Sequence, residues 1–502
     1  MLRKLRTAAA IVCFLLIMLL FLDFTGTLYH LFGWLAKIQF LPAVLALNVG
    51  VVLLLVAMTL ILGRIYCSVI CPLGVFQDVV SWVARQRKKN RFTYSPALSW
   101  LRYGILVLFI VAIVVGISSL VAIFEPYSAF GRIASNLFAP VYQWGNNILA
   151  YFAERMNSYI FYTVDVWLKN IVPLIVAIVT FVVITVLAWR DGRTYCNTIC
   201  PVGTVLGFLA KFSLFKPIIN TEKCNRCGLC ARNCKASCID SKSHMIDYSR
   251  CVTCMDCMDI CNKKAIKYEF RLKAQKNVVK VIESNDHQKS NETDISRRNF
   301  LSVAALFAFT TALKSQNKKM DGGLAAIEDK KVPTRSTRLT PPGSLSAHNL
   351  QQHCTACQLC ISGCPNQVLR PSGSLMTFMQ PEMSYERGYC RPECVRCSEV
   401  CPTSAINKIT TADKSAIQIG HAVWIKKNCV VINDKVSCGN CARHCPTGAI
   451  QMFPLDSNNV DSLKIPVVNT ERCIGCGACE NLCPSRPFSA IYVEGHERHH
   501  IV

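Results

Sequence analysis

Residues 224–234 read Cys-Asn-Arg-Cys-Gly-Leu-Cys-Ala-Arg-Asn-Cys, and residues 251–261 repeat the same cysteine spacing. Three cysteines at Cys-x2-Cys-x2-Cys spacing, with a fourth three residues further on, form the run that holds [4Fe–4S] clusters in bacterial proteins. Zinc sites also use Cys-x2-Cys pairs, but the third and fourth cysteines at this spacing favour iron–sulfur clusters. The two runs therefore predict an α+β unit with two clusters over residues 216–275.

The fourth cysteine of each run is expected to bind the cluster of the other run. A proline usually follows this cysteine, but Lys235 and Asn262 take its place here, so the ligands are retained while the local turn departs from the usual one. The expected ligands are Cys224, Cys227, Cys230 and Cys261 for one cluster, and Cys251, Cys254, Cys257 and Cys234 for the other.

Residues 348–502 contain four more runs, each ending in Cys-Pro. The two inner runs share the continuation Cys-Pro-Thr-x-Ala-Ile, at 401–406 and 445–450, which indicates an internal repeat. Sixteen ligands predict four clusters here and six in total. The spacing leaves the pairing of runs open, although joining the first with the fourth and the second with the third would keep neighbours close. The ligands are Cys354, Cys357, Cys360, Cys364, Cys390, Cys394, Cys397, Cys401, Cys429, Cys438, Cys441, Cys445, Cys473, Cys476, Cys479 and Cys483.

Thirty cysteines in 502 residues need a chemical explanation. Disulfide frameworks belong to small secreted domains, whereas this chain is long and begins with apolar segments, so metal ligation is the better explanation. The formal charge of +24 could indicate a nucleic-acid partner, but the basic residues lie beside apolar segments, as they do in membrane proteins. We therefore expect a membrane partner and no nucleic acid.

Four apolar segments predict membrane helices. Residues 43–63, 103–124 and 171–189 are each close to the roughly 20 residues that span a bilayer, and a first helix is expected from residue 7 to about Leu28. Arginine and lysine cluster before the first span, between the second and third, and after the fourth, which places those ends in the cytoplasm. The loop 125–170 is then outside, and the chain is a multi-pass protein of the bacterial inner membrane.

A fifth hydrophobic segment, 296–313, follows Ser296-Arg297-Arg298 and resembles a twin-arginine export signal. Its 14 or so apolar residues make about 21 Å of helix, which is short for a span. A plain helix start is the alternative, but either a short anchor or an export signal would place the residues that follow outside. We expect 1–215 to be a membrane domain, 216–275 a cytoplasmic cluster unit, 276–347 a linker, and 348–502 a periplasmic cluster unit.

Four further cysteines lie in a repeated motif. Gly-Arg-x-Tyr-Cys-x3-Cys-Pro-x-Gly occurs at 63–74 and again at 192–203, each time just after a membrane span on the same face. The spacing predicts that each pair lies on one face of a helix at the cytoplasmic boundary. Structural helix starts with inert thiols are one interpretation, and a redox-active or metal-binding group is the other. The cysteines are Cys67, Cys71, Cys196 and Cys200, and the two left over are Cys13 and Cys238.

Residues 1–270, with four spans, two Tyr-Cys-x3-Cys-Pro boxes and a two-cluster run, resemble the NapH membrane ferredoxins, and the boxes also occur in NosR and CcoG. Residues 296–502 resemble the NapG/MauM polyferredoxins. The chain thus resembles a fusion of the two. The resemblance implies a four-span α-helical bundle followed by an α+β ferredoxin domain and a tandem ferredoxin-like four-cluster domain. It also implies quinol oxidation, with electrons passed from the quinone pool to a periplasmic reductase.

Two functions follow as hypotheses. The first is an electron-transfer subunit of a quinol dehydrogenase, rather than a stand-alone enzyme, with six [4Fe–4S] clusters and menaquinol or ubiquinol as the diffusible donor. The second is a CcoG-like assembly factor whose boxes reduce or deliver a metal. The sequence has no covalent-haem motif, nicotinamide fingerprint or P-loop. Glu125, Tyr127 and Arg132 are considered for the quinone site, but a buried charge pair in an ordinary loop explains them equally well, and the site stays unassigned.

Overall fold

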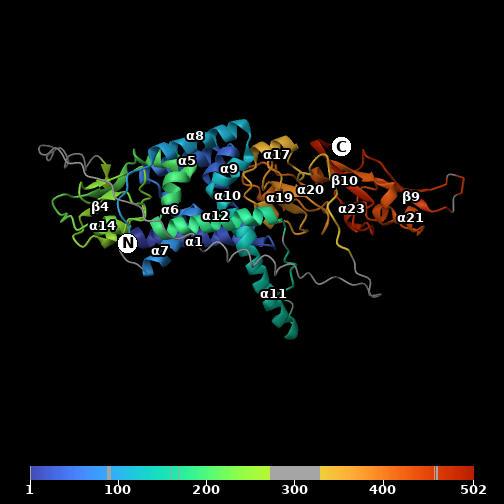
Figure 1. Ribbon diagram of the computed structural model, residues 1–502, viewed down its shortest axis with the longest axis horizontal. Helices are drawn as coiled ribbons and strands as arrows, with labels where there is room; N and C mark the ends of the chain where they lie inside the picture. The colour runs from blue at the N-terminus through green and yellow to red at the C-terminus, as the bar shows by residue number, and fades with distance from the viewer. Residues whose placement is uncertain are drawn as a thin grey trace, which may run out of the picture.

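The structure is a computed structural model, and it describes residues 2–87, 92–158, 160–167, 169–271, 328–456, 458–459 and 462–501. The molecule is elongated (Figure 1). The first cysteine unit, with α14 (Leu229–Arg232) and β4 (Ile266–Phe270), lies at one end, and long helices fill the middle. The second cysteine unit, with α21 (Val430–Asn433) and β9 (Lys464–Val468), lies at the other end. The predicted segment 296–313 falls outside the described residues.

Two helices of the middle layer, α1 (Leu2–Leu22) and α12 (Ile171–Asp191), are long and apolar enough to cross a membrane. Two more, α5 (Val49–Leu62) and α8 (Ser99–Val115), are apolar but have 14 and 17 residues. The apolar run predicted over 43–63 is not one continuous helix, because α4 (Phe40–Leu45) ends within it, Leu47 takes a φ of 51°, and α5 begins only at Val49. The side chain of Asn48 then caps α5 by accepting the Val51 amide.

Two other predicted helix bounds also change. The run 103–124 is interrupted at Gly116, whose φ of 81° ends α8 before α9 (Ser118–Phe124) begins. The first helix ends at Leu22 rather than near Leu28, because the Asp23 carboxylate accepts the amides of Gly26 and Leu28 at 2.6 and 2.9 Å. Polar caps and single left-handed residues therefore divide stretches whose hydropathy is continuous.

Shorter helices complete the middle layer. The segment 125–170 supplies α10 (Pro126–Ile133), which is buried along its whole length, and α11 (Ala139–Arg155), which extends away from the bundle (Figure 1). The others are α2 (Thr27–Phe32), α3 (Trp34–Lys37), α6 (Ile65–Val69), α7 (Pro72–Arg87), η1 (Ala134–Phe138), η2 (Tyr195–Ile199) and α13 (Pro201–Ala210).

Each cysteine unit is built from short helices and small antiparallel sheets. In the first unit, β1 (Phe215–Ile219) pairs with β4, β2 (Ile239–Asp240) pairs with β3 (Met245–Ile246), and α14 packs against α15 (Asp256–Ile260). In the second unit, the longest pair is β7 (Ile417–Trp424) with β10 (Ile491–Ile501). The other strand pairs are β5 (Leu369–Pro371) with β6 (Pro381–Met383), and β8 (Ile450–Pro454) with β9. The helices of this unit, besides α21, are α17 (Ala347–His353), α18 (Leu359–Ser362), α19 (Arg396–Val400), α20 (Thr411–Ala416), η5 (Lys426–Asn428), α22 (Asn440–Arg443) and α23 (Ala478–Leu482).

A buried ion pair stabilises the second unit. Arg335 Nη2 lies 2.6 Å from Glu480 Oε1, and the other carboxylate oxygen accepts the Val493 amide at 2.8 Å. We expect Arg335→Met to lower the free energy of opening of β10 by about 3 to 5 kcal/mol, because the variant leaves the Glu480 carboxylate buried without its cation. Hydrogen exchange at the Val493 amide measures this free energy.

The stability that Arg335→Met loses should depend on pH in a defined direction. Burial raises the pKa of Glu480 even with Arg335 beside it. A carboxyl with a raised pKa binds its proton more readily in the folded state, so the stability of Arg335→Met should increase as the pH falls toward the pKa of Glu480. Arg335→Lys, which keeps the charge, is the control, and an equal loss in both variants would contradict a role for the charge.

Candidate metal centres

The thiols of the second unit gather into four groups. Three cysteines of one run lie beside the fourth cysteine of the neighbouring run. The Cys360 thiol, for example, has Cys354, Cys357 and Cys401 as neighbours, with Cys397 of the adjacent group also nearby. The suggested pairing of the first run with the fourth is therefore wrong, because the structure pairs the first with the second and the third with the fourth. The groups are Cys354/357/360/401, Cys390/394/397/364, Cys429/438/441/483 and Cys473/476/479/445.

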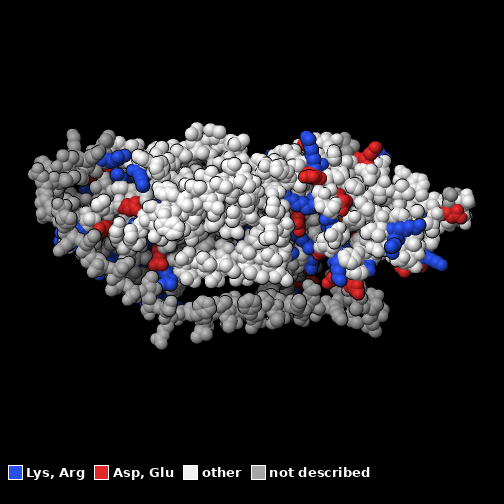
Figure 2. Space-filling model, turned by 45° about the horizontal axis from the view of Figure 1, so that its top comes forward, with Lys and Arg blue, Asp and Glu red and all other residues white. Residues whose placement is uncertain are grey.

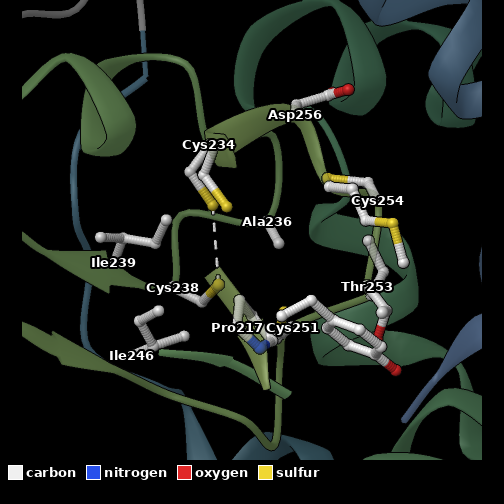
Figure 3. Close-up of a pocket in the computed structure, with 14 residues that line it drawn as sticks. Pro217, Cys234, Ala236, Cys238, Ile239, Ile246, Cys251, Thr253, Cys254 and Asp256 are labelled. Atoms are coloured by element: carbon white, nitrogen blue, oxygen red, sulfur yellow. Dashed lines mark hydrogen bonds between the residues drawn. The ribbon is translucent and has the colours of Figure 1, made fainter. Parts of the chain in front are cut away.

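One group of the first unit lines a pocket together with Pro217 and Tyr268 (Figure 3). It consists of Cys234, Cys251, Cys254 and Cys257, which is the predicted set with its fourth member from the other run. Cys224 and Cys227 lie near Cys230, which belongs to α14, and Cys261 follows the last residue of α15. The described cysteines form no disulfide.

Cys238 was not among the ligands expected from the sequence. Its thiol is buried in the same pocket, with its Sγ 3.6 Å from Cys234 Sγ (Figure 3). The sequence does contain a signal, since the position four residues after the last cysteine of a run is alanine at Ala265, Ala405 and Ala449. Cys238 thus puts a fifth sulfur beside this group.

The chemistry of the groups fits iron–sulfur clusters. Burial raises the pKa of Cys254, Cys354 and Cys476 to about 12 in each case. A buried thiol stays protonated unless a cation compensates the thiolate, and iron supplies that charge on binding. Three closely spaced thiols with a fourth from a separate run would hold such a cluster, and a cluster there would supply one-electron transfer.

The two Tyr-Cys-x3-Cys-Pro boxes meet inside the bundle. We call Cys67, Cys71, Cys196 and Cys200 the central quartet, and all four side chains are buried. The Cys200 thiol has the thiols of the other three as its neighbours. The prediction that each pair shares a helix face is wrong, because α6 ends at Val69 and η2 at Ile199, and Pro72 and Pro201 begin new helices. The second cysteine of each pair therefore lies in a bend.

The boxes bind each other reciprocally. Arg64 of the first box donates from Nη2 to the Cys196 carbonyl at 3.2 Å, and Arg193 of the second donates from Nη1 to the Cys67 carbonyl at 2.5 Å. Both arginines are fully buried. A Cβ at Gly74 or Gly203 would come within 2.3 Å of the carbonyl oxygen of the first cysteine in its own box. The repeat in the sequence thus becomes a pseudo-symmetric pair of segments that approach closely.

An ionic group joins the quartet to the first unit. Asp78 of α7 lies 2.7 Å from Arg193 and 3.0 Å from Lys235, and Lys235 also lies 3.1 Å from Asp256. Burial alone would raise the pKa of Asp78, but the cations of Arg193 and Lys235 hold it below its ordinary value. Lys235 directly follows Cys234 in the sequence, so this ionic group connects a box to a cluster-binding run.

At the opposite end of the bundle, α10 and η1 contact the first run of the second unit. Ser128 Oγ donates to the Thr355 carbonyl, Asn136 Nδ2 donates to Gln358 Oε1 at 2.7 Å, and a Cβ on Gly131 would come within 2.2 Å of the Cys357 carbonyl. Glu125, Tyr127 and Arg132 are all buried in this region. Their placement shows a packed joint between the bundle and the second unit.

Comparisons with known proteins agree with these cysteine groups. A family model described as a 4Fe-4S binding domain matches residues 44–91 and 173–221, and one described as a 4Fe-4S dicluster domain matches 436–486. The methylamine utilization ferredoxin-type protein MauM of Methylobacillus flagellatus is 31% identical over 172 residues, which are 32% of this chain and 70% of that protein. The chain belongs to the MauM-type ferredoxin family.

Other relatives of this MauM-type protein carry related names. The ferredoxin-type protein NapF of Escherichia coli K12 is 28% identical over 36% of this chain and 99% of its own length. NapG of the same strain is 28% identical over 32% of this chain and 75% of its own length. No solved structure matches. The presence of 4Fe-4S ferredoxin domains is confirmed, and the protein is an iron–sulfur electron-transfer protein related to Nap and Mau electron-transfer proteins.

Proposed function

We propose that this protein carries electrons from a membrane quinol, through six [4Fe–4S] clusters, to a periplasmic reductase. The observation that carries the proposal is the position of the two cysteine units at opposite ends of an apolar helical layer (Figure 1). In Figure 2 the middle of the molecule is almost free of coloured charged atoms, while Lys, Arg, Asp and Glu appear at both ends. Charged ends with an uncharged belt between them suit a protein that sits across a bilayer.

The cytoplasmic assignment of the first unit rests on charge. Arg3, Arg6 and Arg85 all bind acidic partners beside the first unit, and these basic residues are the ones that the positive-inside rule places in the cytoplasm. The second unit would then be periplasmic, as expected for a NapH-like membrane half fused to a NapG-like half. The breaks between α4 and α5 and between α8 and α9 leave Leu47 and Ile117 exposed, so in this arrangement they would lie in the interfacial regions of the bilayer and not in its hydrocarbon core.

A cleft of about 650 Å³ offers a place for the quinol. It lies between the outer end of the bundle and the second unit. Its walls mix aromatic and aliphatic side chains with many polar ones, so groups that could hydrogen-bond the quinol hydroxyls lie beside apolar surface for its ring. One wall is Cys364, a member of the second thiol group. Quinol oxidation releases two electrons and two protons. The residues that line the cleft and could contact the quinol include Phe24, Ala139, Gln143, Tyr162, Lys169, Leu174 and Ile361.

We expect Ala139→Trp to slow quinol-driven reduction of the clusters at least tenfold, because the indole would fill the cleft. The measurement is the bleaching of visible absorbance when a short-chain quinol is added anaerobically to the full protein. Reduction by dithionite should be unchanged. The matched control is Ile148→Trp on the same helix, at an exposed position that does not line the cleft.

Two results would argue against the proposal. If the unmodified protein is reduced by dithionite but not by any quinol, the quinol assignment fails. If Ala139→Trp and Ile148→Trp react equally fast, the cleft is not the quinol site. The CcoG-like alternative predicts instead that purified protein reduces or transfers a metal ion such as copper in a reaction that needs Cys67 and Cys196 but no quinol.

A further inference from the structure

The thiols of the central quartet each have a hydrogen-bond donor. Gln77 Nε2 lies 3.2 Å from Cys196 Sγ, and Arg64 Nη2 lies 3.8 Å from Cys67 Sγ. The amide of Gly203 donates to Cys200 Sγ at 3.3 Å, and the amide of Gly74 donates to Cys71 in the same way. Donors aimed at sulfur stabilise thiolates and tune the metal clusters that thiolates hold. The Gly74 and Gly203 amides belong to the first turns of α7 and α13, so Cys71 and Cys200 also cap those helices, whereas helix capping does not explain the side-chain donors Gln77 and Arg64.

A buried charge at the quartet also lacks a carboxylate. Arg64 is fully buried, and its guanidinium donates to neutral acceptors: Asn197 Oδ1 at 2.8 Å, the Ser249 carbonyl at 3.1 Å and the Cys196 carbonyl. Within the described part of the chain, no Asp or Glu forms an ion pair with Arg64. A cation buried in this way is costly unless an anion compensates it. An iron–sulfur centre held by four thiolates carries net negative charge and would supply that compensation.

The quartet lies between the two cysteine units. On one side, the backbone amide of Arg193 donates to the carbonyl of Lys235 at 2.7 Å, and Lys235 is the residue next to Cys234. On the other side, the Tyr195 hydroxyl donates to the Phe124 carbonyl at 3.2 Å, two residues before α10, which contacts the run around Cys357. The bundle thus places a group of four cysteines where an electron crossing from one unit to the other would pass.

We propose that the central quartet holds a seventh iron–sulfur centre, of the [4Fe–4S] type, inside the bundle. It accepts one electron at a time from the nearest cluster of one unit and passes it to the nearest cluster of the other. The cysteine ligands of each cluster stay bound during this transfer, and no proton has to move. The 4Fe-4S binding domain model matches both segments that contain the quartet. The proposal does not depend on which molecule donates electrons, so it can stand or fall separately from the quinol assignment.

Iron and acid-labile sulfide content of the anaerobically purified full chain tests the proposal. Six [4Fe–4S] clusters contain about 24 iron atoms, and a seventh raises the count to about 28. The double variant Cys71→Ser/Cys200→Ser should lose about four iron atoms and one cluster's share of the reduced-state paramagnetic resonance signal. Cys13→Ser, at a cysteine of α1 outside the quartet, is the matched control and should lose none.

Arg64→Met provides a second variant that keeps every cysteine. It should retain all the iron and shift the midpoint potential of a single centre downward, because removing a nearby positive charge disfavours the added electron. A wild-type count of about 24 that the double variant leaves unchanged would overturn the proposal. The proposal would also be overturned if the four cysteines of the quartet were found as two disulfides in protein that had lost no iron during purification. If the double variant fails to fold, the wild-type count alone decides.

Discussion

Asp78→Asn is expected to loosen the first cysteine unit from the bundle and to cost about 3 to 5 kcal/mol. The carboxylate lies between the cations of Arg193 and Lys235, at 2.7 and 3.0 Å, and all three side chains are largely buried. An amide of the same size removes the negative charge and leaves two buried cations that repel each other. The expected result is a lower midpoint of thermal unfolding for the first unit, with faster hydrogen exchange around Lys235 and Ser249.

The charge of Asp78 gives this prediction its pH dependence and its control. Since its neighbours hold the pKa of Asp78 below the ordinary value, the carboxylate stays ionised in the neutral range, and its stabilising effect is lost only as the pH falls through that lowered pKa. Asp191→Asn removes a carboxylate from an exposed position at the end of α12, and it should change neither measurement. Equal behaviour of the two variants would show that the ionic group does not join the boxes to the first unit.

Gly131→Val is expected to separate the second unit from the bundle. A Cβ at this position would lie 2.2 Å from the Cys357 carbonyl and 3.0 Å from the Phe21 ring, so the two surfaces cannot close on a larger residue. Overpacking of this kind typically costs 1 to 3 kcal/mol, and here the clash is with backbone. Electron transfer between the units should fall by at least tenfold while the iron content stays the same. The transfer is measured by mixing the protein rapidly with a reductant, freezing samples at set times, and recording their electron paramagnetic resonance spectra.

Gly145→Val is the matched control for the second prediction. Gly145 lies on α11, and no atom lies within 4 Å of the Cβ that a substitution would add. It should therefore leave both docking and electron transfer unchanged. Unaltered transfer in Gly131→Val would mean that the contact between α10 and Cys357 is not on the electron path.

The cysteine runs could be recognised because cluster geometry fixes their spacing, whereas the way in which the structure groups them could not be predicted. Which run supplies the fourth cysteine depends on how the chain folds back between runs, and two of the gaps are irregular in length. The structure brings Cys401 to the first run and Cys483 to the third. The strand pair β7–β10 closes around the third and fourth runs, and this long-range contact has no local signal.

The apolar helices of the bundle were predictable in place but not in continuity. Hydropathy averaged over a window does not register a single left-handed residue such as Leu47 or Gly116. The central quartet was predictable from the repeated motif, but the bend at the second cysteine of each box was not predicted. Pro72 and Pro201 are the residues that could have indicated this bend. Proline begins a helix readily but does not continue one, so each Cys-Pro marks a bend rather than a shared helix face.

We propose that the two cysteine units face opposite sides of the membrane. An epitope inserted in the exposed turn between Lys242 and Ser243, and a second placed after Val502, test it in the full-length protein. In spheroplasts treated with protease from outside, only the epitope after Val502 should be lost, and lysis should expose the other. Loss of both epitopes, or protection of both, in intact spheroplasts would contradict electron delivery across the membrane.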